Sequence, residues 1–64
     1  RGGNVIVYSK DRKKYLVEFA YNARYNDLQD DWSEYRDEAF NYDNNELEFI
    51  KEVYQFEDLE IIYD

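Results

Sequence analysis

The chain has 64 residues, with 8 Lys and Arg against 16 Asp and Glu, which gives a formal net charge of −8 at pH 7. It contains no Cys and no His, which excludes a disulfide framework, a thiolate or imidazole metal site, and a Cys or Ser–His catalytic pair. Aromatic residues make up 20% of the sequence, and this content argues against disorder. No apolar run approaches the roughly 18 residues of a membrane span.

The length predicts one domain. We treat residues 1–3, Arg-Gly-Gly, as a flexible start or a cloning scar, and we assign residues 4–64 to a single domain. A domain near 60 residues buries only about 60% of its unfolded surface, so we expect no pocket of drug size. Ser9 and Ser33 are the serines of the chain, and no His is present to activate them. We therefore expect a binding protein without enzymatic activity, without a cofactor and without a metal site.

Two strands joined by a hairpin are predicted first in the chain. Residues 4–8 are short and β-branched, residues 9–13 are polar, and residues 14–21 alternate in polarity. Strict alternation places Tyr15, Val17, Phe19 and Tyr21 on one face and Leu16, Glu18 and Ala20 on the other. A hairpin alone is marginally stable in water, so we expect another element to cover it.

A helix is predicted over residues 26–41. Asn26 fits an N-cap with Gln29 as its capping-box partner. Apolar residues then recur at i, i+4, i+7 and i+11, within an arc of about 60° on a helical wheel. These residues are Leu28, Trp32, Tyr35 and Ala39. The polar run that begins at Asn41 is expected to end this helix.

A second helix is predicted over residues 45–56, with Asn45 as its cap and Glu48 in the capping-box position. The alternation over residues 46–49 also fits a strand, which stays an alternative. Residues 59–63 read as a C-terminal strand. The predicted order is β-β-α-α-β, and the predicted fold is α+β, with a three-stranded, mostly antiparallel sheet and both helices on one face.

Charge is divided unevenly along the chain. Residues 1–24 carry a net charge of +4, whereas residues 25–64 carry −12, and such asymmetry is typical of an interaction surface. On the predicted first helix, the carboxylates fall within an arc of about 120°, opposite the apolar residues. They are Asp27, Asp30, Asp31, Glu34, Asp37 and Glu38. Like charges at this spacing destabilise a helix, so the stripe is a candidate functional surface; the alternatives are a solvated helix face and a general interface for basic partners.

A partner with a basic surface fits such a stripe. We expect a nucleic-acid-binding protein, such as a nuclease or an effector complex, to be bound and occluded, and we expect no direct binding to nucleic acid or to a membrane. The predicted partner-binding residues are Asp27, Asp30, Asp31, Glu34, Asp37, Glu38 and Asp43, flanked by Tyr25 and Tyr42. A second hypothesis is a small adaptor, antitoxin-like domain or accessory subunit that binds through a Tyr-rich surface or a strand edge.

The size, acidity and aromatic content, mainly over residues 26–64, resemble those of small phage-encoded inhibitors that mimic DNA, such as anti-CRISPR and anti-restriction proteins. The resemblance is compositional and rests on no motif. It implies a protein that blocks access of nucleic acid to its target in the host cytoplasm. The basic residues of the predicted hairpin depart from a purely acidic mimic; they are Lys10, Arg12, Lys13 and Lys14.

Overall fold

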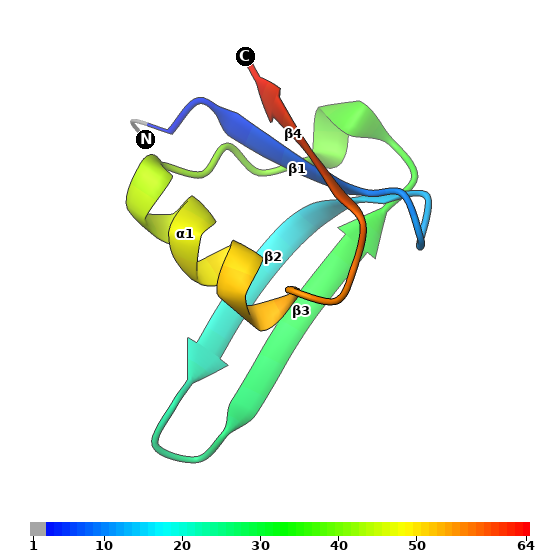
Figure 1. Cartoon of the computed structure of the whole chain (residues 1–64). Helices are drawn as coiled ribbons and strands as arrows, with labels where there is room; N and C mark the ends of the chain where they lie inside the picture. The colour runs from blue at the N-terminus through cyan, green and yellow to red at the C-terminus, as the bar shows by residue number, and fades with distance from the viewer. Residues whose placement is uncertain (1–2) are drawn as a thin grey trace.

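A computed structural model describes residues 3–64, which form a bent antiparallel sheet and one α-helix (Figure 1). The elements in chain order are β1 (Val5–Ser9), β2 (Lys14–Asn22), β3 (Asp27–Ser33), the 3-10 turn η1 (Arg36–Glu38), α1 (Asn44–Val53) and β4 (Leu59–Tyr63). The four strands lie in the order β3-β2-β1-β4, and every neighbouring pair is antiparallel.

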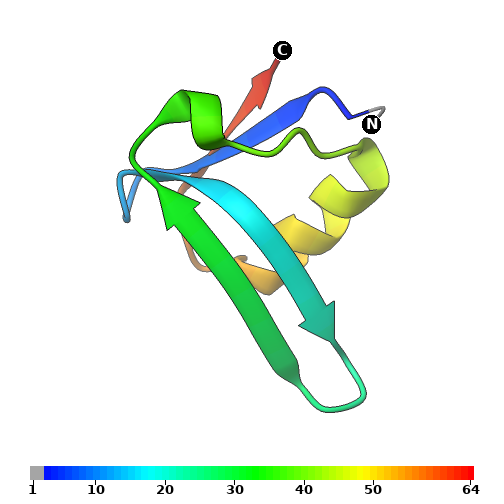
Figure 2. The same cartoon turned by 180° about the vertical axis from the view of Figure 1, so that it is seen from behind.

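The sheet has two unlike faces. In Figure 1 α1 lies in front of β2 and β3, and in Figure 2, seen from behind, the strands lie in front of α1. We call the side on which α1 packs the helix-covered face and the opposite side the open face. The segment with η1 follows β3, and Tyr42 then forms an isolated bridge with Val5 of β1. This bridge occupies the side of β1 from which β2 diverges.

The predicted three-stranded sheet with two helices is wrong, because residues 26–41 form β3 and η1 and not a helix. Asn26 does not cap a helix. It adopts a positive φ of 50° in the β2–β3 turn, a conformation that Asn tolerates, and its side chain accepts a hydrogen bond of 2.7 Å from Tyr21. The strand is favoured because it pairs with β2 from Asn22 to Tyr15 and brings Trp32 opposite Leu16. A helix with six carboxylates on one face has no comparable gain.

The predicted second helix is confirmed as a helix, with shifted ends. Asp43 is the N-cap, and it forms a capping box with Glu46 through hydrogen bonds of 2.8 and 3.0 Å. Asn45 and Glu48 are therefore not the capping pair. This register buries Leu47 and Ile50 on the side of α1 that faces the sheet, so the packing of the helix settles the alternative of a strand over residues 46–49.

Strict alternation along β2 is also wrong, because the register shifts between Leu16 and Glu18. A β-bulge inserts one residue into one strand of a pair, so the side chains after it change face. Leu16, Phe19 and Tyr21 therefore lie on the helix-covered face: Leu16 is fully buried, and the other two rings contact Phe49 of α1 at 5.9 and 5.4 Å between centroids. Glu18 turns to the open face opposite Asp31.

The core lies between the sheet and α1. Its fully buried aliphatic side chains are Val5, Val7, Leu16 and Ile50, and Tyr42, Leu47 and Tyr54 complete the cluster. Gly3 packs at the edge of this core, where a Cβ would lie 2.5 Å from the carbonyl carbon of Tyr42. Gly3 therefore belongs to the folded unit, whereas Arg1 and Gly2 of the predicted flexible start lie outside the described residues.

Candidate functional site: the open face of the sheet

The open face is acidic and carries no basic residue on its strands. The strand pairing assigns to it Ile6, Tyr8, Tyr15, Glu18, Ala20, Asn22, Asp27, Gln29, Asp31, Ser33, Glu60 and Ile62. Four of these residues are carboxylates, and none is Lys or Arg within the described strands. Carboxylates from three separate strands thus lie on this face, and Arg36 of η1 lies beside Ile6 at its edge, 3.8 Å from Asp64.

Stability does not account for this charge pattern. Glu18 and Asp31 are exposed and lie directly opposite each other on β2 and β3. Like charges at directly opposed positions destabilise a sheet, whereas opposite charges there stabilise it. A Lys at either position would relieve the repulsion without disturbing the core, so the pair is a candidate for a surface that a partner covers.

Aromatic and acidic groups meet at one end of this face. The rings of Tyr8 and Tyr15 lie 4.7 Å apart at a tilt of 55°. Ser33 lies opposite Tyr15 and donates a hydrogen bond to Glu38 of η1. Tyr is enriched at interface hot spots because its ring supplies apolar area and its hydroxyl a hydrogen bond. The two tyrosines and the neighbouring carboxylates therefore combine apolar area, hydrogen-bonding groups and negative charge at this end of the face.

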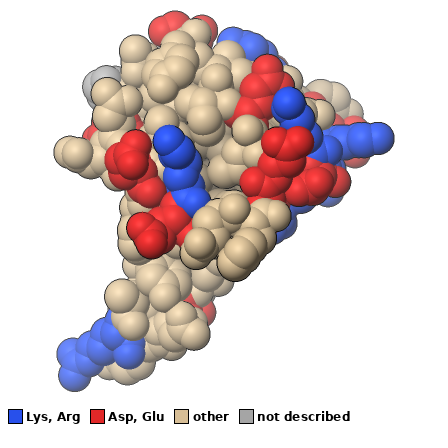
Figure 3. All heavy atoms as spheres, in the orientation of Figure 1, with Lys and Arg blue, Asp and Glu red and all other residues tan. Residues whose placement is uncertain are grey.

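Charges on the opposite side of the molecule are mixed. Figure 3 shows this side, with acidic and basic groups interspersed and basic groups at the tip of the β2–β3 hairpin. Arg12 forms an ion pair with Glu57 at 2.7 Å, and Lys51 lies 3.8 Å from Glu48. Strand residues that include carboxylates but no Lys or Arg are thus a property of the open face and not of the whole surface.

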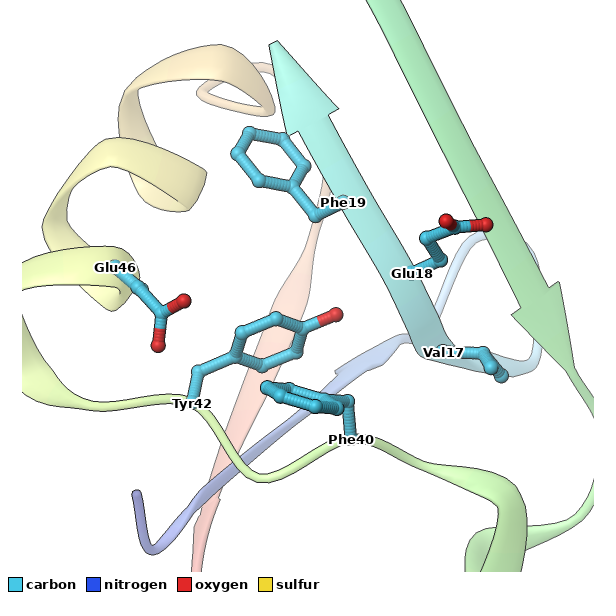
Figure 4. Close-up of a pocket in the computed structure, with 6 residues that line it drawn as sticks. All are labelled: Val17, Glu18, Phe19, Phe40, Tyr42 and Glu46. Carbon is cyan, nitrogen blue, oxygen red and sulfur yellow. The ribbon is translucent and has the colours of Figure 1, made fainter. Parts of the chain in front are cut away.

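A small cavity lies where β2 diverges from the segment that leads into α1 (Figure 4). Its volume is about 210 Å³, and its lining is Val17, Glu18, Phe19, Phe40, Tyr42 and Glu46. Tyr42 is 3% exposed, and its hydroxyl finds no hydrogen-bond partner among the described residues. Burial raises the pKa of Tyr42, and the charges of Glu46 and Glu18 raise it further. The hydroxyl is therefore protonated at neutral pH.

The densest hydrogen-bond network lies on the helix-covered face. Arg12 binds both carboxylate oxygens of Glu57, at 3.0 and 2.7 Å, and its guanidinium lies 4.4 Å from the ring centroid of Trp32. Asp30 accepts hydrogen bonds from Trp32 Nε1 at 2.9 Å and from the hydroxyl of Tyr54. The network joins the β1–β2 turn, β3 and the segment after α1. All its members satisfy one another, so it holds the fold together.

The charges of this network shift the pKa values of its acids. The hydrogen bond from Arg12 holds the pKa of Glu57 below its usual value against the effect of burial. Burial alone would raise the pKa of Asp30, but hydrogen bonds from Tyr54 and Trp32 and the charge of Arg12 together lower it. Acids with a lowered pKa in the folded state stabilise it above their unfolded pKa, and this stabilisation is lost as the pH falls.

The stability that Glu57 adds is therefore expected to disappear in acid. Glu57→Gln should lower the free energy of unfolding at pH 7 by about 1 kcal/mol, the typical loss of a charged hydrogen bond at a partly exposed site. The gap between wild type and variant should close as the pH falls below about 4, because protonated Glu57 resembles Gln. Urea unfolding at pH 7, 5 and 3 measures the gap, with Glu52→Gln on the exposed side of α1 as control. A gap that is constant with pH would contradict this role.

The predicted partner-binding residues do not share one surface. Asp27 and Asp31 lie on the open face, and Asp30 lies on the helix-covered face, 2.9 Å from Trp32. Asp43 caps α1 and Tyr42 is buried. The others are exposed: Tyr25 in the β2–β3 turn, Glu34 after β3, and Asp37 and Glu38 in η1. Whether any of these residues contacts a partner stays a prediction.

The predicted site residues did not include four residues of the open face, which are Tyr8, Tyr15, Glu18 and Glu60. Glu60 lies opposite Tyr8, although 52 positions separate them in the chain. No local pattern brings such positions together. The one available signal was the period of two in β4, which places Glu60 and Ile62 on the same side.

An apolar groove lies between the β2–β3 hairpin and α1. It has a volume of about 590 Å³, and its apolar lining includes Tyr21, Leu28, Phe49 and Val53. Leu28 is 37% exposed and Phe49 is 43% exposed, and Phe56, two residues beyond Tyr54, is 94% exposed. Exposed apolar patches often mark protein contacts, and this groove is the second candidate surface of the molecule.

Comparison with known proteins gives no match: no family model, curated protein or solved structure is significantly similar to the chain. Within residues 3–64, no helix is long and apolar enough to cross a membrane. The same residues contain no group of three or more acidic side chains that converge as metal ligands would. The candidate site is therefore defined by its charge, its aromatic rings and its cavity alone.

Proposed function

We propose that this chain is a non-enzymatic protein-binding domain that uses the open face to bind a basic surface of another protein. The observation that carries the proposal is the charge of that face, with Glu18, Asp27, Asp31 and Glu60 on its strands and no Lys or Arg among them. Complementary charge steers association and disfavours partners of the same sign. Nucleic acid is such a disfavoured partner.

A nucleic-acid-binding protein is the partner class that we propose. Such proteins gather Lys and Arg on one surface to contact phosphates. The open face offers them carboxylates distributed from β3 to β4 across the sheet and not a line of charge, with Asp27 and Asp31 spaced at about 3.3 Å per residue along β3. A domain seated on the basic surface excludes nucleic acid by occupying the same site, so inhibition by occlusion is the proposed mechanism.

Charge reversal on the open face tests the proposal. Glu18→Lys with Asp31→Lys should abolish capture of a nucleic-acid-binding protein from lysate, whereas Glu48→Lys with Glu52→Lys on α1 changes the net charge equally and should leave capture within about twofold. Capture by wild type should fall between about 50 mM and 500 mM salt and in the presence of duplex DNA. Equal losses in both paired variants, or capture that ignores DNA, would contradict binding through the open face.

The adaptor hypothesis remains the second candidate, and the exposed groove residues Leu28 and Phe49 favour it. Binding there buries apolar area, so it should depend weakly on salt. Leu28→Ser should then weaken capture more than the reversal of Glu18 and Asp31 does. The two sets of variants thus separate the two surfaces in one assay.

A further inference from the structure

The cavity beside Tyr42 adds a ligand site to the proposed function. That the ligand comes from the basic partner rests on the proposed function. We propose that this cavity binds the primary ammonium group of a lysine side chain from the basic partner. Its lining combines aromatic rings from Phe19, Phe40 and Tyr42 with Glu46 and Glu18, and in Figure 4 the carboxylate of Glu18 extends from β2 toward β3.

Aromatic rings form part of the cavity lining. Phe40 and Tyr42 lie 4.9 Å apart between centroids at a tilt of 55°, and Phe19 approaches the same cavity from β2. A cation over the face of an aromatic ring, within about 6 Å of its centroid, is attracted by the ring quadrupole. An aliphatic group would fill the same space, but it would gain nothing from the two acidic groups in the lining.

The buried hydroxyl of Tyr42 is a second feature of the cavity, independent of the rings. The residue is 3% exposed, and its oxygen makes no hydrogen bond to any described residue. In Figure 4 the hydroxyl points toward β2, near Glu18 and Val17. Buried polar groups are nearly always hydrogen-bonded, and an orphan calls for an explanation. A ligand N–H group that donates to this oxygen provides the missing partner.

The carboxylates define the sign of the ligand. Glu18 lies on the open face beside Asp31, at the rim of the cavity, and Glu46 lies across it at the start of α1. The carboxylate of Glu46 accepts from the backbone N–H of Asp43 at 3.0 Å, which holds it in place. After burial, the charges of both acids disfavour ionisation of the Tyr42 hydroxyl. The lining therefore favours a positive charge.

The volume of the cavity and the acceptor oxygen of Tyr42 favour a primary ammonium over other ligands. About 210 Å³ is too small for a drug-sized molecule but admits the end of one side chain. A metal ion such as Ca²⁺ needs six to eight oxygen ligands, and no group of three acidic side chains converges within residues 3–64. A quaternary ammonium has no N–H to give to Tyr42. Lysine combines a compact charge with three N–H donors.

Titration with n-butylammonium chloride, followed by the NMR signals of the aromatic rings, tests the cavity without any protein partner. We expect saturable shifts of Phe19, Phe40 and Tyr42, with binding at least fivefold weaker for tetramethylammonium, which lacks N–H groups, and none for n-butanol, which lacks charge. Saturable binding of n-butanol to the same rings would overturn the proposal, as would the absence of saturable shifts with butylammonium up to about 100 mM. The Arg1→Ser variant of the full chain is titrated in parallel, because Arg1 supplies a cation two residues before Gly3, and saturable binding in either form supports the cavity.

Two variants and their matched controls assign the roles of the lining. Tyr42→Phe should weaken butylammonium at least threefold and leave tetramethylammonium unchanged, whereas Tyr35→Phe, at an exposed tyrosine, should change neither. Glu18→Gln should weaken both cations, whereas Glu48→Gln should not. Tyr42→Phe removes only an unpaired hydroxyl, so it should fold with unchanged or higher thermal stability. Unchanged butylammonium binding in folded Tyr42→Phe would overturn the role of the hydroxyl, whatever partner the open face binds.

Discussion

Replacing Ile50 by alanine is expected to lower the free energy of unfolding by about 3–4 kcal/mol, the largest effect of any substitution considered. Ile50 is fully buried on α1 and belongs to the cluster with Val5, Val7 and Leu16. Alanine removes most of its buried surface and leaves a cavity that a small core fills poorly. A domain of this length has a total stability of about 3–10 kcal/mol, so little of it would remain.

Urea unfolding followed by far-UV circular dichroism measures the loss at Ile50. Phe56→Ala is the control, because Phe56 is also a large apolar residue near α1 but is 94% exposed. The control should change the free energy of unfolding by less than about 0.5 kcal/mol. A loss below about 1 kcal/mol in Ile50→Ala would mean that α1 does not pack on the sheet as described.

Replacing Asp30 by alanine is the second large effect, with an expected loss of about 3 kcal/mol. The carboxylate accepts from Trp32 Nε1 at 2.9 Å and from the hydroxyl of Tyr54, which belongs to a residue only 5% exposed. Without Asp30, both donors lose their acceptor, and each buried unpaired group costs about 1–3 kcal/mol. Arg12 also loses a favourable charge in its surroundings.

Asp31→Ala is the matched control for Asp30, because it changes the same residue type one position along the chain. Asp31 is exposed on the open face, opposite Glu18. Its removal should change stability by less than about 1 kcal/mol, since one repulsive pair disappears with it. Equal effects at the two positions would contradict the strand and favour an exposed helix over residues 26–41. Thermal unfolding of both variants measures the two losses of stability.

Local signals in the sequence predicted most of the elements. The β-branched and alternating runs predicted β1, β2 and β4 to within one residue of their ends, and the capping pattern predicted a helix over residues 45–56, where α1 (Asn44–Val53) forms. The exact cap was wrong because three consecutive residues, Asp43, Asn44 and Asn45, all suit the N-cap. Only the packing of Leu47 and Ile50 against the sheet selects Asp43.

Residues 26–41 were mispredicted because two periods fit them. Leu28 and Trp32 are four positions apart, which suits one face of a helix and equally one face of a strand. Asp30 lies between them and reads as a solvated residue, so the period of two was hidden. In the fold its charge is satisfied by Trp32, Tyr54 and the nearby Arg12. The pairing of β3 with β2 is long-range, and no local pattern shows it.

The candidate site was predictable in its charge but not in its geometry. The excess of carboxylates over residues 25–64 pointed to an acidic surface, and Asp27 and Asp31 do lie on the open face. Glu18 joins them only because a bulge turns it, and no glycine marks that bulge. The burial of Tyr42 depends on its bridge to Val5, far away in the chain. These features come from the tertiary structure.

The central claim is that basic groups bind the open face, and mapping a pentalysine peptide onto the backbone amides by NMR tests it most directly. The account predicts saturable shifts that cluster at Tyr8, Tyr15, Glu18, Asp31 and Glu60, and that disappear at about 500 mM salt. The same peptide should leave those amides unshifted in the variant with Glu18→Lys and Asp31→Lys. Shifts that cluster on α1, at Glu48 and Glu52, would contradict the claim.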